Sequence, residues 1–100
     1  MTLDLIFQDN TLILKGVLNN QTIQQDLFVS QRKKIASIQT LTINLEAITH
    51  LDSAGLAWLL NAIRDAHAAN ISLAWQHIPD KLLQLARLSS AESFFTTPSA

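Results

Sequence analysis

The sequence contains no cysteine, which excludes disulfide bonds and thiolate metal sites and suits a reducing compartment. Glycine occurs only at positions 16 and 55, too few and too far apart for a glycine-rich phosphate-binding loop. The three histidines, at positions 50, 67 and 77, do not have the spacing of metal ligands, and no acidic residue completes a cluster with them. We therefore expect neither a metal nor a cofactor.

Charge is also sparse. Only 15% of the residues are charged and the formal net charge is −1, with one basic cluster at Arg32, Lys33 and Lys34. A balanced chain with one small basic patch has little electrostatic reason to bind nucleic acid. That cluster is interpreted as the solvated face of a helix.

Long hydrophobic runs are missing as well. The longest apolar run, Ala54 to Leu60, is far shorter than the roughly 20 residues that a transmembrane helix needs. Met1 to Asp4 lacks the basic start and the apolar stretch of a signal peptide. We expect a cytoplasmic protein without direct membrane insertion. Hydrophobic residues nevertheless make up 48% of the chain, more than a small core usually needs, so a partner is expected to cover some of them.

Alternating apolar and polar residues predict strands at 3–7 and 12–15, joined as a hairpin through Gln8-Asp9-Asn10, and further strands at 41–46 and 71–75. Residues 16–20 are expected to leave the sheet. Helical spacing of apolar residues predicts helices over 21–38, over 53–69 with Asn70 at its end, and over a segment that starts near Pro79 and includes Leu88.

The order of these elements predicts an α/β fold with a mixed sheet of about four to five strands and helices packed mainly on one face. All 100 residues are expected to form one domain. Residues 91–95 should pack back onto it with Phe94 or Phe95 buried, followed by a polar, frayed tail at 96–100.

The centre of this pattern is the stretch from Leu41 to Asn70, which holds a strand, a bend and an amphipathic helix. Asp52-Ser53-Ala54-Gly55 stands at the bend. Asp and Ser side chains accept hydrogen bonds from the unpaired NH groups of a first helical turn, and the helix dipole favours a negative charge there. This motif therefore predicts a helix start.

A strand, a short hydrophobic link and Asp-Ser-x-Gly opening a helix that continues Leu-Ala-x-Leu-Leu resemble the signature of STAS domains, found in anti-sigma factor antagonists and at the ends of some transporters. With the later Leu85-Ala86-Arg87-Leu88, the chain is most similar to the MlaB-type STAS subunits of Mla phospholipid-transport ABC complexes. The resemblance implies a STAS-like fold and a non-enzymatic subunit. In antagonists the hydroxyl residue after this Asp is the phosphoacceptor, and in MlaB-type proteins the matching position lies where the partner ATPase docks.

Three interpretations of Ser53 were weighed. A hydrolase elbow needs glycine two residues before the serine, and Leu51 stands there; no histidine is placed beside Ser53 by the sequence. A structural role as a helix cap, by Asp52 or Ser53, is compatible with partner binding. A phosphate on Ser53 would lie beside Asp52 and inside any docked surface, where it would oppose binding.

Trp58 is the second candidate. At about 100° per residue, the large apolar residues of the helix define a core side, and Trp58 falls nearly opposite them. The members of that core side are Leu56, Leu59, Leu60 and Ile63, with His67 near its end. We expect Trp58 to face outward as a partner contact, with a covering loop as the alternative. The predicted partner-binding residues are Asp52, Ser53, Ala54, Gly55, Trp58 and Ala62.

Two functional hypotheses follow. The first is a subunit that binds the ATPase of an Mla-type transporter, peripherally at an inner-membrane complex, and supports its role in outer-membrane lipid asymmetry. The second is an anti-sigma factor antagonist that binds an anti-sigma factor with serine kinase activity and is regulated by phosphorylation of Ser53.

Overall fold

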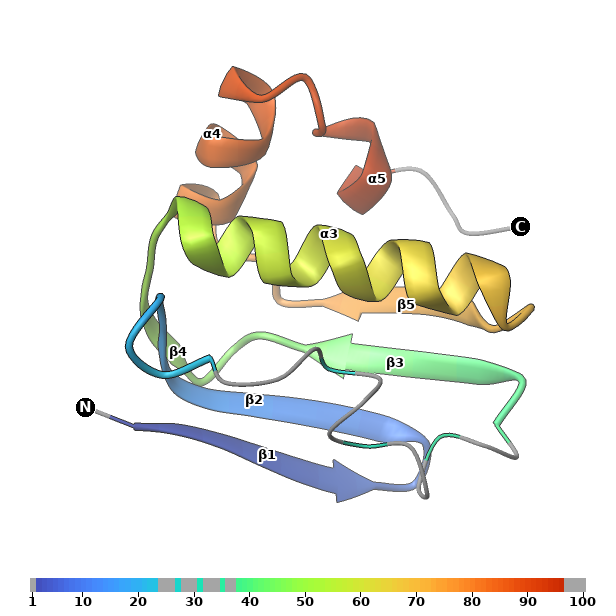
Figure 1. Ribbon diagram of the computed structural model, residues 1–100. Helices are drawn as coiled ribbons and strands as arrows, with labels where there is room; N and C mark the ends of the chain where they lie inside the picture. The colour runs from blue at the N-terminus through green and yellow to red at the C-terminus, as the bar shows by residue number, and fades with distance from the viewer. Residues whose placement is uncertain (1, 24–26, 28–30, 32–34, 36–37, 97–100) are drawn as a thin grey trace.

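The computed structural model describes residues 2–23, 27, 31, 35 and 38–96. Its strands are β1 (Leu3–Gln8), β2 (Thr11–Leu18), β3 (Thr40–Asn44), β4 (Ile48–Leu51) and β5 (Ser72–Gln76). Its helices are α3 (Ser53–Ala68), α4 (Asp80–Leu88) and α5 (Ser93–Thr96). The predicted α/β class and the mixed sheet are confirmed (Figure 1).

The strand order is β1-β2-β3-β5, and β4 pairs with β2 beside this path. β1 and β2 form the predicted antiparallel hairpin, and Asp9 and Asn10 turn the chain with positive φ angles of 51° and 61°. The other pairings, β2 with β3, β2 with β4 and β3 with β5, are all parallel. The carboxyl ends of β2, β4 and β5 therefore meet at one edge of the sheet.

β2 continues further than the sequence suggested. Residues 16–20 were expected to leave the sheet, but Gly16, Val17 and Leu18 pair with β4. The register shifts between Gly16 and Val17, and Gly16 has a φ of +112°, a conformation that side chains disfavour. A Cβ at Gly16 would also collide with the carbonyl oxygen of Thr2. Glycine thus allows β2 to bend and pair with a second partner strand.

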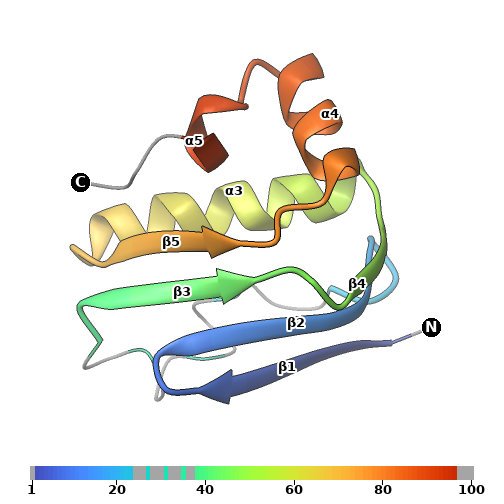
Figure 2. The same ribbon diagram turned by 180° about the vertical axis from the view of Figure 1, so that it is seen from behind.

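The helices lie mainly on one face of the sheet, as predicted. α3 crosses that face, while α4 and α5 lie against α3 on the β5 side (Figure 1). In the view from behind, none of the described helices covers the opposite face (Figure 2). Fully buried side chains alternate along the central strands, as expected for a half-buried sheet. They are Leu12, Leu14, Leu41 and Ile43.

The C-terminal part agrees with the sequence with one adjustment. Asn70 ends α3 with a φ of 58°, and Pro79 is the residue before α4 and not within its first turn. Phe95 is 4% exposed and Phe94 54% exposed, which confirms that one of the two is buried. The Phe95 ring meets Trp75 edge-on at 4.9 Å between centroids.

Some predictions fall on residues outside the described part. Most of the helix predicted over 21–38, including the basic cluster at 32–34, and residues 97–100 of the predicted tail are among them. Leu27 and Ile35 are described and buried, and the NH groups of Gln31 and Ile35 each donate to the carbonyl four residues earlier, at 3.0 Å. Within the described ranges, no helix combines the length and the hydrophobicity that crossing a membrane requires.

Candidate functional site

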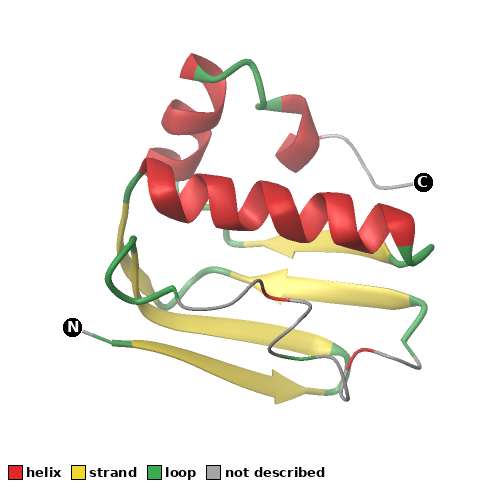
Figure 3. Ribbon diagram, in the orientation of Figure 1, coloured by secondary structure: helices red, strands yellow, loops and turns green. Residues whose placement is uncertain are grey.

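The candidate site lies at the edge of the sheet where β2, β4 and β5 end. Figure 3 shows the short connection from β4 into α3 at this edge, beside the loop that follows β2. In open α/β sheets this is the edge at which ligands usually bind, because the loops there can vary without disturbing the sheet. The Asp52-Ser53 motif stands at this connection.

Asp52 caps α3. Its backbone is extended, with φ −132° and ψ −170°, and its Oδ1 accepts hydrogen bonds from the NH groups of Ala54 at 3.0 Å and Gly55 at 3.1 Å. Its own NH donates to the carbonyl of Leu18 at 3.3 Å. Asp52 therefore satisfies the first turn of α3 and ties the helix start to the end of β2.

The alternatives for the cap are thereby decided: Asp52 provides it, and Ser53 is the first residue of α3. The Ser53 side chain is exposed. Its hydroxyl has no hydrogen-bonding partner among the described residues, and the ring of nearby His50 contacts Thr49 Oγ1 at 3.2 Å instead. Ser53 is accessible to another molecule, and the structure gives it no histidine base.

Replacement of Asp52 by alanine should lower the free energy of unfolding by about 1 kcal/mol, because two first-turn NH groups lose their acceptor. Asp52→Asn should stay close to the wild type, since an asparagine oxygen can accept the same bonds. Urea titration followed by circular dichroism measures both variants. Equal losses in the two variants would show that the charge matters and the cap does not.

Gly55 is buried because α3 approaches β2 closely here. A Cβ at this position would lie 2.5 Å from the carbonyl oxygen of Leu18 and 2.9 Å from its Cγ. Contacts this short do not occur between real atoms, so only glycine fits without movement. Gly55 positions the helix; its lack of exposure makes it a structural member of the motif.

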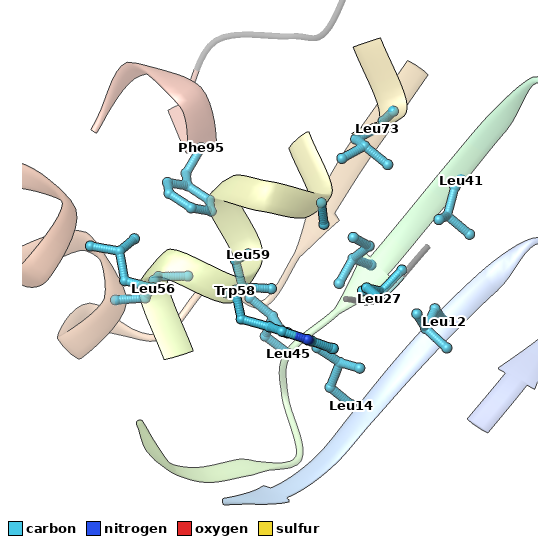
Figure 4. Packing of buried hydrophobic residues seen from close by; sticks show 14 of the residues in the cluster. Leu12, Leu14, Leu27, Leu41, Leu45, Leu56, Trp58, Leu59, Leu73 and Phe95 are labelled. Atoms are coloured by element: carbon cyan, nitrogen blue, oxygen red, sulfur yellow. The ribbon is translucent and has the colours of Figure 1, made fainter. Parts of the chain in front are cut away.

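The prediction that Trp58 faces outward is wrong. Trp58 is 5% exposed and belongs to the core, and Figure 4 shows its ring extending from α3 towards Leu14 and Leu45. The buried face of α3 combines the small residues Gly55, Ala62 and Ala66 with the large residues Leu56, Leu59 and Trp58. Trp58 lies only about 60° around the helix from Gly55, so its ring reaches the core.

Of the six predicted partner-binding residues, the structure leaves three accessible. Asp52 and Ser53 are exposed and Ala54 is partly buried, whereas Gly55, Trp58 and Ala62 are buried. Ala62 faces the sheet and offers no room for a partner around an indole. His67, expected at the border of the core side near the helix end, is exposed. The accessible site is therefore the start of α3.

The comparisons with known proteins agree with this arrangement. The fold is similar to a solved structure titled as the anti-sigma factor antagonist SpoIIAA in its unphosphorylated form, with a TM-score of 0.62 and 15% sequence identity. The match covers 86% of this chain and 82% of that one. No match was found among curated protein sequences. The mixed sheet with the Asp-Ser start of its central helix defines a STAS fold.

The sequence comparison assigns the chain to a smaller group of proteins than the fold does. The family model described as "Mlab, STAS domain" matches residues 1–96. The chain belongs to this MlaB-type family of STAS domains, as the resemblance in its motif indicated. Members of the STAS family are generally non-catalytic regulatory or binding domains that act through contacts with other proteins.

One part of this edge was not anticipated from the sequence. β4 and the start of α4 form a groove beside the Asp52-Ser53 motif, lined in part by His50 and Lys81. Residues 47–51 were predicted only as a short link between a strand and a helix, because four residues show no clear alternation of apolar and polar side chains. A Lys that follows Pro-Asp at a helix start was the only available signal, and it carries little information alone.

Proposed function

We propose that this chain is a non-catalytic STAS subunit that binds the ATPase of an Mla-type phospholipid-transport ABC transporter. In this role it would support assembly or activity of a complex that maintains outer-membrane lipid asymmetry. The match of residues 1–96 to the MlaB-type family carries the proposal. The exposed Ser53 at a rigidly capped helix start supports it, because such a surface can be contacted without rearrangement.

The contact is placed at Asp52, Ser53 and Ala54, at the amino end of α3. Gly55, Trp58 and Ala62 contribute by fixing the position of the helix. On this proposal the chain lies on the cytoplasmic side of the inner membrane, attached through the ATPase. Phospholipid does not need to touch it.

The proposal is tested by replacing Ser53 with glutamate and measuring affinity for the Mla-type ATPase of the same organism by calorimetry. Ser53→Glu should weaken binding at least about tenfold, because a carboxylate is then desolvated at the contact without a partner. An acidic residue is tolerated at a helix start, so the fold should persist. Ser53→Ala should bind like the wild type.

Ser93→Glu provides the matched control, since Ser93 is also exposed and also the first residue of a helix, α5. It should leave affinity unchanged. Wild-type affinity in Ser53→Glu would rule out this contact, and a wild-type chain that does not bind the ATPase at all would remove the proposal itself.

The second candidate is an anti-sigma factor antagonist controlled by phosphorylation of Ser53. The observation that favours it is the exposed Ser53 hydroxyl directly after the capping Asp52, which a kinase could reach. Incubation with ATP and the candidate kinase of an anti-sigma pair separates the two functions. Stoichiometric label that disappears in Ser53→Ala favours the antagonist, whereas an unlabelled chain that binds the ATPase favours the transporter subunit.

A further inference from the structure

A groove of about 250 Å³ lies between β4 and the start of α4, at the same edge of the sheet as Ser53. It is lined by Ile48, Thr49, His50, Leu51, Pro79 and Lys81. Leu51 directly precedes the Asp52-Ser53 motif, so the groove adjoins the proposed contact. A protein that covers Ser53 is therefore well placed to enter it.

The lining of the groove has an apolar part and a polar part. Ile48, Leu51 and Pro79 provide an apolar wall, which favours an apolar side chain. Two polar atoms of β4 have partners within the chain: Thr49 Oγ1 donates to the carbonyl of Gly16 at 3.1 Å, and His50 Nδ1 lies 3.2 Å from Thr49 Oγ1. Lys81 is exposed and forms no ion pair with any described residue.

The other described lysine and arginine residues do not line the groove. Arg64 pairs with Asp65 and Arg87 with Glu92, the latter at 2.8 Å. Lys15 also forms no ion pair with the described residues, but it lies on β2 opposite Asp4, in the hairpin with β1. Lys81 is thus the lining residue whose charge is left for an incoming group.

Asp52 and Asp80 are next to lining residues in the sequence, and neither belongs to the lining. Asp52 is engaged with the NH groups of α3. Asp80 is exposed in the first turn of α4 beside Lys81 and forms no ion pair within the described ranges. Among the residues that line the groove, Lys81 is the one that carries a full charge.

We propose that this groove takes a segment of the partner ATPase in which an acidic side chain stands next to an apolar one. The carboxylate pairs with Lys81, and the apolar side chain fills the space beside Ile48, Leu51 and Pro79. This inference rests on the proposed function, because it names the chemistry of the partner at the same edge. It adds a second contact, one that selects the partner by charge.

The test is calorimetric titration of the ATPase with chains changed at Lys81. Lys81→Glu should weaken binding about tenfold, because attraction becomes repulsion, and Lys81→Gln should weaken it about threefold. The affinity of the wild type should also fall more steeply with added salt than that of Lys81→Gln. Lys15→Glu makes the same charge change at the other described lysine without an ion pair, and it should bind like the wild type.

A spectroscopic readout locates the contact independently of charge. In spectra of the isotopically labelled chain, the amide signals of Ile48, Thr49, Leu51 and Lys81 should shift or broaden when the ATPase is added. Those of β1 should remain unchanged.

The outcomes separate this inference from the function it rests on. If Ser53→Glu weakens binding while Lys81→Glu and Lys15→Glu both match the wild type, the groove is not a charged contact and only this inference is overturned. If all three variants weaken binding equally, the effect is general charge and the inference also fails. If the wild-type chain does not bind the ATPase, this inference and the proposed function are both overturned.

Discussion

Replacement of Trp58 by alanine should lower the free energy of unfolding by about 3–5 kcal/mol, the usual cost of removing a large buried aromatic side chain. Trp58 is 5% exposed and lies in the core cluster beneath α3. Its removal leaves a cavity between the helix and β2 that the rigid sheet cannot close. Urea unfolding followed by circular dichroism measures the loss.

The control for this prediction is Phe94→Ala. Phe94 is also aromatic but 54% exposed, so its loss should change stability by less than about 1 kcal/mol. If Trp58→Ala is instead as stable as the wild type and loses only partner binding, the indole is a surface contact and its placement in the core is incorrect.

Gly55→Ala should lower the free energy of unfolding by about 2 kcal/mol, because the added Cβ must push α3 away from the Leu18 carbonyl. The direction of this stability change distinguishes two causes. Helix propensity alone would make alanine more stable than glycine by about 1 kcal/mol, so a net loss can only come from the close approach. Thermal and urea unfolding both report it.

Ala57→Gly is the reciprocal control, at an exposed position of the same helix. It should cost about 1 kcal/mol through propensity alone. A Gly55→Ala chain more stable than the wild type would mean that α3 can shift freely, and the contact with Leu18 would then have no structural role. Leu18→Ala should partly relieve the strain of Gly55→Ala when the two are combined.

The start of α3 was predictable from the sequence because its determinants are local. An Asp that accepts bonds from NH groups two and three residues later needs nothing from the rest of the fold. Of the two caps that the motif allowed, Asp52 and Ser53, the structure shows Asp52. The hairpin of β1 and β2 is local in the same way, since Asp9 and Asn10 tolerate the turn. The family resemblance combined the local Asp-Ser motif with the order of the elements along the chain.

The orientation of α3 was not predictable by the same reasoning. Counting only large apolar residues placed the core side at Leu56, Leu59, Leu60 and Ile63. Leu56 and Leu59 are buried as expected, whereas Leu60 and Ile63 are only partly buried. The buried face extends past Leu59 to the small residues Gly55 and Ala62, which a count of large residues leaves out. Gly55, Ala62 and Ala66 lie within about 40° of one another around the helix, and this spacing was the available signal.

β4 was not predicted because the residues that make it a strand lie in another segment of the chain. Residues 48–51 have partly buried ends and an exposed Thr49 and His50 between them, which is no strand alternation. They form a strand only because β2 bends at Gly16 and offers its last residues as a pairing partner. A pairing that depends on a bulge elsewhere in the chain cannot be read from four residues, and the groove beside it was missed for the same reason.

The carbonyl of Leu18 has a consequence for recognition. It accepts the NH of Asp52 and also limits how close α3 can come at Gly55. The end of β2 thus fixes the positions of Asp52 and Gly55, which lie before and after Ser53, and this surface is ordered before any partner binds. Binding therefore costs little conformational entropy at this surface. Differences in affinity among variants should appear as differences in dissociation rate, without a slow conformational phase.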